Sequence, residues 1–128
     1  MKGIPVWQDR LGRILLVLSA ISAAGAFVGG LAAAASATPD RLWLETWRTL
    51  GFLVFTGLFA LLAWRPRTTA GVWELVIVNK GALSILGLVY RSAESLSAVP
   101  FDLALTAVLA AAYLLTRGWR SWMRIEAT

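Results

Sequence analysis

The feature that most constrains this chain is a long uncharged run near its N-terminus. No Asp, Glu, Lys or Arg occurs between Arg13 and Asp40. A helix rises about 1.5 Å per residue, so about 20 apolar residues cross the hydrocarbon core of a bilayer. A helix of a soluble bundle would need a polar face on such a stretch. We therefore interpret the run as a membrane-spanning helix.

Three more apolar stretches of similar kind follow it, and 59% of all residues are hydrophobic. Pro39, Pro66 and Pro100 separate the stretches, and we expect Pro100 in the first turn of the last helix, after a polar connection over 92–99. The sequence predicts an all-α polytopic membrane protein, a four-helix transmembrane bundle in one domain over 1–128. The predicted spans cover residues 14–35, 44–64, 72–90 and 101–118.

The basic residues predict the orientation of these spans. Most of them flank one side of the predicted membrane region: Lys2, Arg10, Arg13, Arg65, Arg67, Arg117, Arg120 and Arg124. The opposite side carries Arg41, Arg48 and Arg91, balanced by acidic residues. Positive charge near span ends stays cytoplasmic, so we expect both termini in the cytoplasm of a bacterial-type inner membrane. The net charge of +5 then reflects orientation in a lipid bilayer, and we expect no nucleic-acid partner.

A second interpretation of the first stretch stays open. Basic residues, an apolar run and then Ala35-Ser36-Ala37 resemble a secretory signal with its cleavage site. Cleavage there would leave three spans and an N-terminus on the outside.

The chain has no Cys and no His. Zinc sites, iron–sulfur clusters, most haem sites and dithiol chemistry lose their usual ligands. We expect no metal and no cofactor.

Small residues line one side of the first predicted helix: Gly12, Ser19, Ala23, Ala26, Gly30, Ala33 and Ala37. Gly25 and Gly29 also form a GxxxG pattern, which allows close helix approach in lipid. One interpretation is packing inside the bundle, and the other is a homodimer through the Gly25/Gly29 face.

The third predicted helix carries the most unusual charge. Lys80 lies near the middle of a span, where a charge costs about 2.5–3.5 kcal/mol on insertion scales. Helical spacing places Lys80, Ser84, Gly87, Arg91 and Glu94 on one face. An ionisable residue at this depth should face the bundle interior, so we expect a polar pocket with Lys80 at its floor.

We infer from this pocket a function in binding an apolar small molecule, or in converting it by acid–base chemistry of isomerase, cyclase or hydrolase type. The candidate catalytic residues are Lys80, Glu74 and Asp102. The candidate substrate-binding residues are Asn79, Ser84, Arg91, Glu94, Glu45, Arg48, Thr56, Thr106 and Tyr113. Three alternatives stay open: structural ion pairs between helices, a non-catalytic partner subunit, and a small transporter.

Two segments carry a family resemblance. Residues 50–58 (LGFLVFTGL) and 63–67 (AWRPR), followed by a third helix with a short polar exit, resemble the small four-helix bacterial membrane proteins called DoxX-like. The resemblance implies a compact bundle and a membrane-associated role with small molecules or in a redox pathway. It transfers no functional residue.

Overall fold

The computed structural model describes residues 3–127, and this part of the chain is helical without any strand. The helices are α1 (Val6–Ala35), α2 (Pro39–Trp64), α3 (Val72–Tyr90), α4 (Ala93–Thr116) and the short α5 (Arg120–Ala127). The first four are long and apolar enough to cross a membrane. The predicted all-α fold with four spanning helices is confirmed, and the chain is a multi-pass membrane protein.

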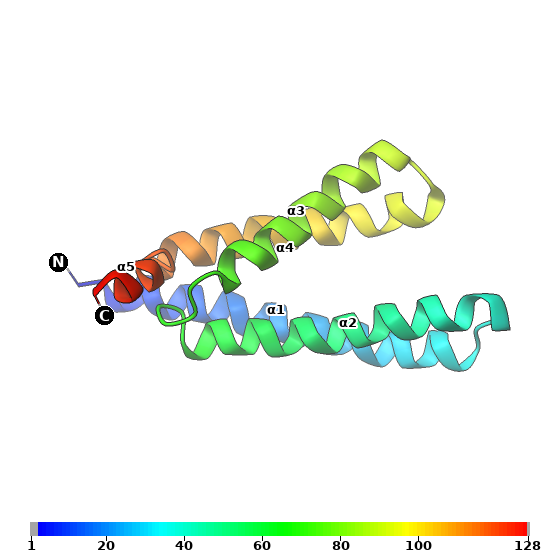
Figure 1. The fold of residues 1–128 in the computed structure, drawn as a ribbon, viewed down its shortest axis with the longest axis horizontal. Coiled ribbons are helices and arrows are strands. Elements are labelled where there is room, and N and C mark those ends of the chain that lie inside the picture. The colour runs from blue at the N-terminus through cyan, green and yellow to red at the C-terminus, as the bar shows by residue number, and fades with distance from the viewer. Residues whose placement is uncertain (1–2, 128) are drawn as a thin grey trace.

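The four long helices form two antiparallel hairpins, α1–α2 and α3–α4 (Figure 1). Both chain termini, α5 and the loop between α2 and α3 lie at one end of the molecule, which we call the terminal end. The two hairpin turns lie at the other end, the loop end. α1 packs against both α2 and α4, whereas α2 and α3 barely touch. The hairpins therefore meet at the terminal end and diverge toward the loop end.

Glycines on α1 explain how closely it approaches its neighbours. A Cβ added at Gly12 would lie 2.5 Å from Cγ2 of Thr116 on α4, and one added at Gly30 would collide with Thr49 on α2. Ser19 and Ala23 are buried on the same side. The predicted small face thus packs inside the chain. Gly25 and Gly29 lie outside it, because an added Cβ at either would have no neighbour within 4 Å.

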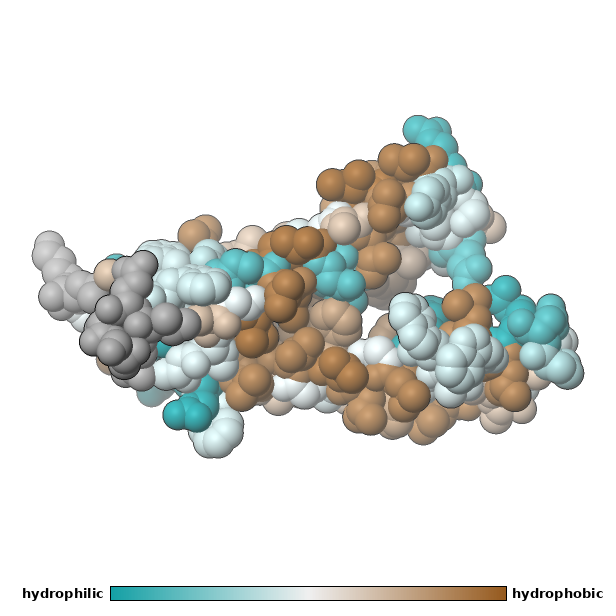
Figure 2. All heavy atoms as spheres, viewed as in Figure 1, coloured by the Kyte–Doolittle hydropathy of each residue, from teal (hydrophilic) through white to brown (hydrophobic). Residues whose placement is uncertain are grey.

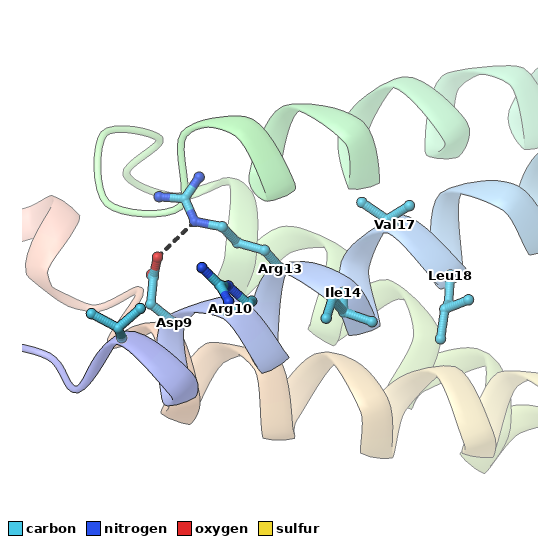
Figure 3. Close-up of a pocket in the computed structure, with 7 residues that line it drawn as sticks. Asp9, Arg10, Arg13, Ile14, Val17 and Leu18 are labelled. Atoms are coloured by element: carbon cyan, nitrogen blue, oxygen red, sulfur yellow. Dashed lines mark hydrogen bonds and ion pairs between the residues drawn. The ribbon is translucent and has the colours of Figure 1, made fainter.

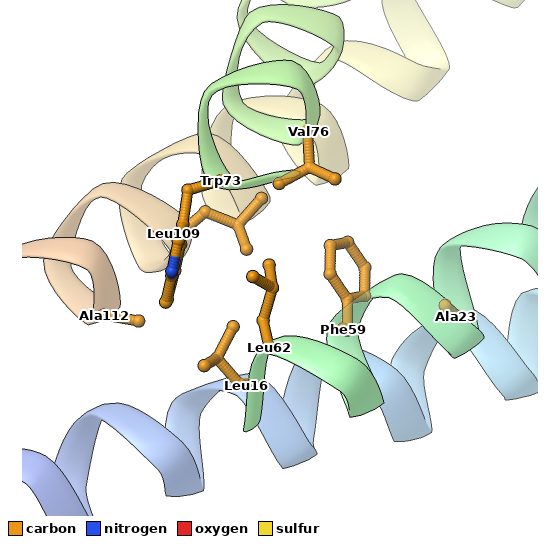
Figure 4. Close-up of a cluster of buried hydrophobic side chains, with 8 residues drawn as sticks. All are labelled: Leu16, Ala23, Phe59, Leu62, Trp73, Val76, Leu109 and Ala112. Atoms are coloured by element: carbon orange, nitrogen blue, oxygen red, sulfur yellow. The ribbon is translucent and has the colours of Figure 1, made fainter. Parts of the chain in front are cut away.

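The hydrophobic core fills the terminal half of the bundle (Figure 4). Leu16 of α1, Leu62 of α2, Trp73 of α3 and Leu109 of α4 are fully buried there. The indole of Trp73 donates a hydrogen bond of 2.8 Å to the carbonyl of Pro66, which also accepts one from Ser121 of α5 at 3.3 Å. These bonds fasten the α2–α3 loop and α5 to the same core.

Helix α4 begins earlier than the sequence predicts. It starts at Ala93, so residues 93–99 are helical and Pro100 lies inside the helix. The expectation of a polar connection over 92–99 with Pro100 in the first turn was wrong. The Ser92 hydroxyl caps the new N-terminus by accepting from the Ser95 amide at 3.0 Å. The extra turns also pack on α3, where the Ser95 hydroxyl donates to the carbonyl of Gly87 at 3.0 Å.

Candidate functional site

The candidate site is centred on an ion pair between α3 and α4. The ammonium of Lys80 lies 3.7 Å from the carboxylate of Asp102. It also lies 4.1 Å from the ring centroid of Phe55 on α2, within the range of a cation–π contact. Lys80 is only 7% exposed, so the charge is held inside the bundle, as the sequence predicts.

The local packing of α3 sets the position of this lysine. Lys80, Ser84 and Gly87 are buried at successive turns of one face. The Ser84 hydroxyl donates back to the Lys80 carbonyl at 2.8 Å. A Cβ at Gly87 would lie 2.5 Å from Val99, so this glycine lets α4 approach α3 closely. The tight α3–α4 contact brings Asp102 within reach of Lys80.

A second polar group links the hairpins at the loop end. One nitrogen of the Arg41 guanidinium lies 3.3 Å from both Glu45 on its own helix and Glu94 at the start of α4. Glu45 is buried and also lies 3.8 Å from Arg48. Arg41 therefore bridges the two hairpins near their tips.

The hairpins are separated between these two polar groups. The space-filling view has a hollow between its two arms, with hydrophilic residues where the arms approach at the loop end (Figure 2). Phe55 and Arg41 are fourteen residues apart on α2, which corresponds to about 21 Å along a helix. We call this hollow the interhairpin cleft. Two described contacts join α2 to the other hairpin: that of Phe55 with Lys80, and the pair of Arg41 with Glu94.

Glu74 lies away from the cleft, in an aromatic cluster at the terminal end. One of its carboxylate oxygens accepts from the Tyr113 hydroxyl at 3.0 Å and from the Trp122 indole at 2.9 Å. The other oxygen is buried with no hydrogen-bond partner among the described residues. Trp73 and Trp119 both contact the Tyr113 ring edge-on. Of the three candidate catalytic residues, the structure joins Lys80 and Asp102 and places Glu74 elsewhere.

The other predicted residues divide in the same way. The hydroxyls of Thr56 and Thr106 bond to carbonyls one turn back on their own helices, and that of Thr106 bonds to the carbonyl of Asp102. Asn79 is exposed. Glu45, Arg48 and Glu94 belong to the loop-end group, and Tyr113 to the aromatic cluster.

One predicted face was wrong in part. Lys80, Ser84 and Gly87 share it, but α3 ends at Tyr90, and Arg91 follows in the left-handed conformation with a φ of 53°. Arg91 is exposed, and Glu94 already belongs to α4. The helical spacing cannot extend through this turn.

Two residues of the candidate site, Phe55 and Arg41, were not identified from the sequence. Phe55 gave no signal, because a phenylalanine in an apolar span looks like core. Arg41 lies four residues before Glu45, a spacing that does indicate a pair on one helix, but its second partner Glu94 is on another hairpin.

The described residues contain no group of three or more His, Cys, Asp or Glu side chains able to hold a metal ion. Comparison with family models, with curated proteins and with solved structures found no match to this chain.

Proposed function

We propose that this protein binds an apolar or amphiphilic small molecule in the interhairpin cleft, with the polar end of that molecule at the Lys80–Asp102 pair. The observation that carries the proposal is the charge of Lys80 in the middle of α3, buried in the bundle between Asp102 of α4 and Phe55 of the other hairpin. Ionisable side chains inside a membrane are expensive and are usually retained for a function.

The geometry of the pair leaves hydrogen-bonding capacity for a ligand. An ammonium has three donors, whereas Asp102 is 3.7 Å from the Lys80 nitrogen, beyond ordinary hydrogen-bond distance. The Phe55 ring covers another side of the charge. A ligand carbonyl, carboxylate or hydroxyl could accept from Lys80, while its apolar part lies along α2 beside rings such as Phe52.

Conversion of the ligand by acid–base chemistry is the finer form of this proposal. It would depend on Lys80 and Asp102 alone, because Glu74 is engaged by Tyr113 and Trp122. A lysine and a carboxyl in contact can pass a proton between themselves and a bound molecule. Binding is the part that the arrangement supports best.

The test separates a binding role of the pair from a structural one. Lys80→Met leaves the mostly buried carboxylate of Asp102, whose side chain is 16% exposed, without its partner, which we expect to cost about 3–5 kcal/mol of stability. The double variant Lys80→Met/Asp102→Leu replaces both charges with apolar groups and should recover most of that loss. Mass spectrometry of the purified wild type should find a co-purifying small molecule, and this molecule should be absent from the stable double variant.

Glu74→Gln is the matched control, because it changes a buried carboxylate outside the cleft and should keep the bound molecule. Two outcomes contradict the proposal. Either no small organic molecule accompanies the wild type from a native membrane extract, or the double variant retains it as well as the wild type does.

A non-catalytic partner subunit is the second candidate, and the exposed glycines of α1 favour it. Gly25 and Gly29 leave an open surface on α1 where another helix could approach closely, including α1 of a second copy. Gly25→Leu and Gly29→Leu should then abolish a dimer seen by native mass spectrometry, whereas Gly51→Leu on α2 should not. A monomeric wild type would rule out this homodimer. Transport, the third alternative, would also require a path through the packed core of the terminal half.

We further propose that both termini face the cytoplasm across a bacterial-type inner membrane. Arg10, Arg13, Arg65 and Arg67 all lie at the terminal end, in agreement with the positive-inside rule. A periplasmic alkaline phosphatase fused after Thr128 should therefore be inactive, and an active fusion would reverse the orientation. The DoxX-like resemblance is also a proposal, resting on residues 50–58 and 63–67.

A further inference from the structure

Helix α1 carries a groove on its outer surface at the terminal end (Figure 3). The groove has a volume of about 380 Å³. Val6, Asp9, Arg10 and Arg13 line its part nearer the start of α1, and Ile14, Val17 and Leu18 continue it along α1 toward the middle of the helix. The three apolar side chains are each about half exposed. The charged side chains of the groove thus lie nearer the start of α1, and past Arg13 the side chains that line it are apolar.

A smaller pocket adjoins the groove through Arg13. It has a volume of about 180 Å³ and lies at the end of α2, lined by Arg13, Trp64, Arg65 and Arg67 among others. Trp64 is 73% exposed, and the Arg65 guanidinium stacks over its ring at 5.6 Å. An exposed tryptophan beside arginines is typical of the headgroup level of a bilayer.

Some arginines of these two pockets are paired with a carboxylate and others are not. Asp9 pairs with Arg13 at 2.8 Å and also with Arg67. Arg13 donates in addition to the carbonyls of Ala63 and Trp64, at 2.8 and 3.0 Å. This network holds Arg13 and Arg67 in place with one carboxylate for two guanidinium groups.

Arg10 and Arg65 have no carboxylate partner within the described chain. Arg10 lines the groove, Arg65 lines the smaller pocket, and Arg13 lines both. The region therefore has an excess of positive charge at the headgroup level, directly above an apolar groove. Guanidinium groups recognise phosphate oxygens through paired N–H donors, so the arrangement is complementary to an anionic headgroup.

We infer that this surface binds an anionic phospholipid, with its phosphate between Arg10, Arg13 and Arg65 and one acyl chain in the groove along Ile14, Val17 and Leu18. The order of the residues supports the inference: Arg10 and Arg13 precede Ile14, Val17 and Leu18 along the groove on α1, and Arg65, at the end of α2, lines the second pocket, which shares Arg13. A soluble anion would leave the apolar part unused. A zwitterionic lipid would bring a positive group next to unbalanced arginines.

The experiment titrates phosphatidylglycerol into the purified full-length protein and counts bound lipids by native mass spectrometry. Arg10→Gln and Arg65→Gln should each weaken the binding about fivefold, and the double variant more, because each basic residue contributes a similar increment to anionic-lipid attraction. Arg91→Gln is the matched control, since it removes one exposed arginine at the loop end. The control should bind phosphatidylglycerol like the wild type.

Two further arms identify the ligand. Phosphatidylcholine should bind at least about fivefold more weakly than phosphatidylglycerol, and inorganic phosphate should not displace the lipid. The inference is overturned if Arg91→Gln weakens binding as much as Arg10→Gln does, if phosphatidylcholine binds equally well, or if phosphate competes. These variants lie outside the interhairpin cleft, so their result is independent of the small-molecule proposal.

Discussion

At the terminal end, all four long helices meet around Leu16, Leu62 and Trp73, whereas at the loop end the described link between the hairpins is the Arg41–Glu94 pair. Both ends are built from the same four apolar helices, so the apolar character of the helices alone does not account for the contrast. In lipid, apolar helix surfaces gain little by leaving the acyl chains, and close packing determines which helices associate. The terminal end has that packing and the loop end lacks it between hairpins.

The contrast is tested most strongly by two tryptophans. Trp73 is fully buried at the terminal end, whereas Trp47 is 69% exposed near the loop end. Trp73→Ala should lower the free energy of unfolding by about 3–5 kcal/mol, because it empties a packed site and removes the hydrogen bond to Pro66. Trp47→Ala should change it by less than about 0.5 kcal/mol. Reversible unfolding in mixed detergent measures both, and equal losses would mean that the core does not lie where the structure places it.

A smaller effect should test how closely α3 and α4 pack within their hairpin. Gly87→Ala forces a Cβ against Val99 and should cost about 1–3 kcal/mol. Gly81→Ala, on the same helix, meets Thr106 at an ordinary 3.9 Å and should gain up to about 1 kcal/mol from better helix propensity. The same unfolding assay reads the difference. A neutral Gly87→Ala would show that α3 and α4 are not in close contact at the loop end.

We expect Arg41→Gln to change the free energy of unfolding least and the distance between the hairpins most. The pair with Glu94 is largely exposed and Glu45 keeps Arg48 nearby, so Arg41→Gln should lower the free energy of unfolding less than Gly87→Ala does. Spin labels at Leu42 and Leu96, in this cysteine-free chain, should nevertheless report a longer and broader distance in the variant. Labels at Ala60 and Leu75 near the terminal end should report no change. An unchanged Leu42–Leu96 distribution would mean that Arg41 does not restrain the hairpins.

The spans could be predicted from the sequence because their cause is local. Helix α3 occupies the residues predicted for it. Gly71 and Arg91, which flank it, both take up the left-handed conformation, so the helix stops at the neighbouring residues. The start of α4 could not be predicted, because it depends on the Ser92 cap and on the contact of Ser95 with Gly87. Together these contacts stabilise the earlier start of the helix more than the preference of Pro100 for a first turn opposes it.

From the sequence we could predict that Lys80 lies inside the bundle, but not which carboxylate pairs with it. The depth of Lys80 indicated that it needed a counter-charge, and several carboxylates were available in the sequence. Asp102 is its partner because Gly87 and Val99 set the register of α3 against α4. The same reasoning explains Glu74: its donors Tyr113 and Trp122 come from α4 and α5, which no spacing rule connects to α3.

The helix contacts also imply an order of assembly during synthesis. α1 and α2 are neighbours in sequence and in space, as are α3 and α4, so each hairpin can form as it enters the membrane. The α1–α4 contact joins the first long helix to the fourth, so it forms only after both have been made. The carbonyl of Pro66 accepts hydrogen bonds from both Trp73 and Ser121, so α5 docks at a loop that α3 has already fixed.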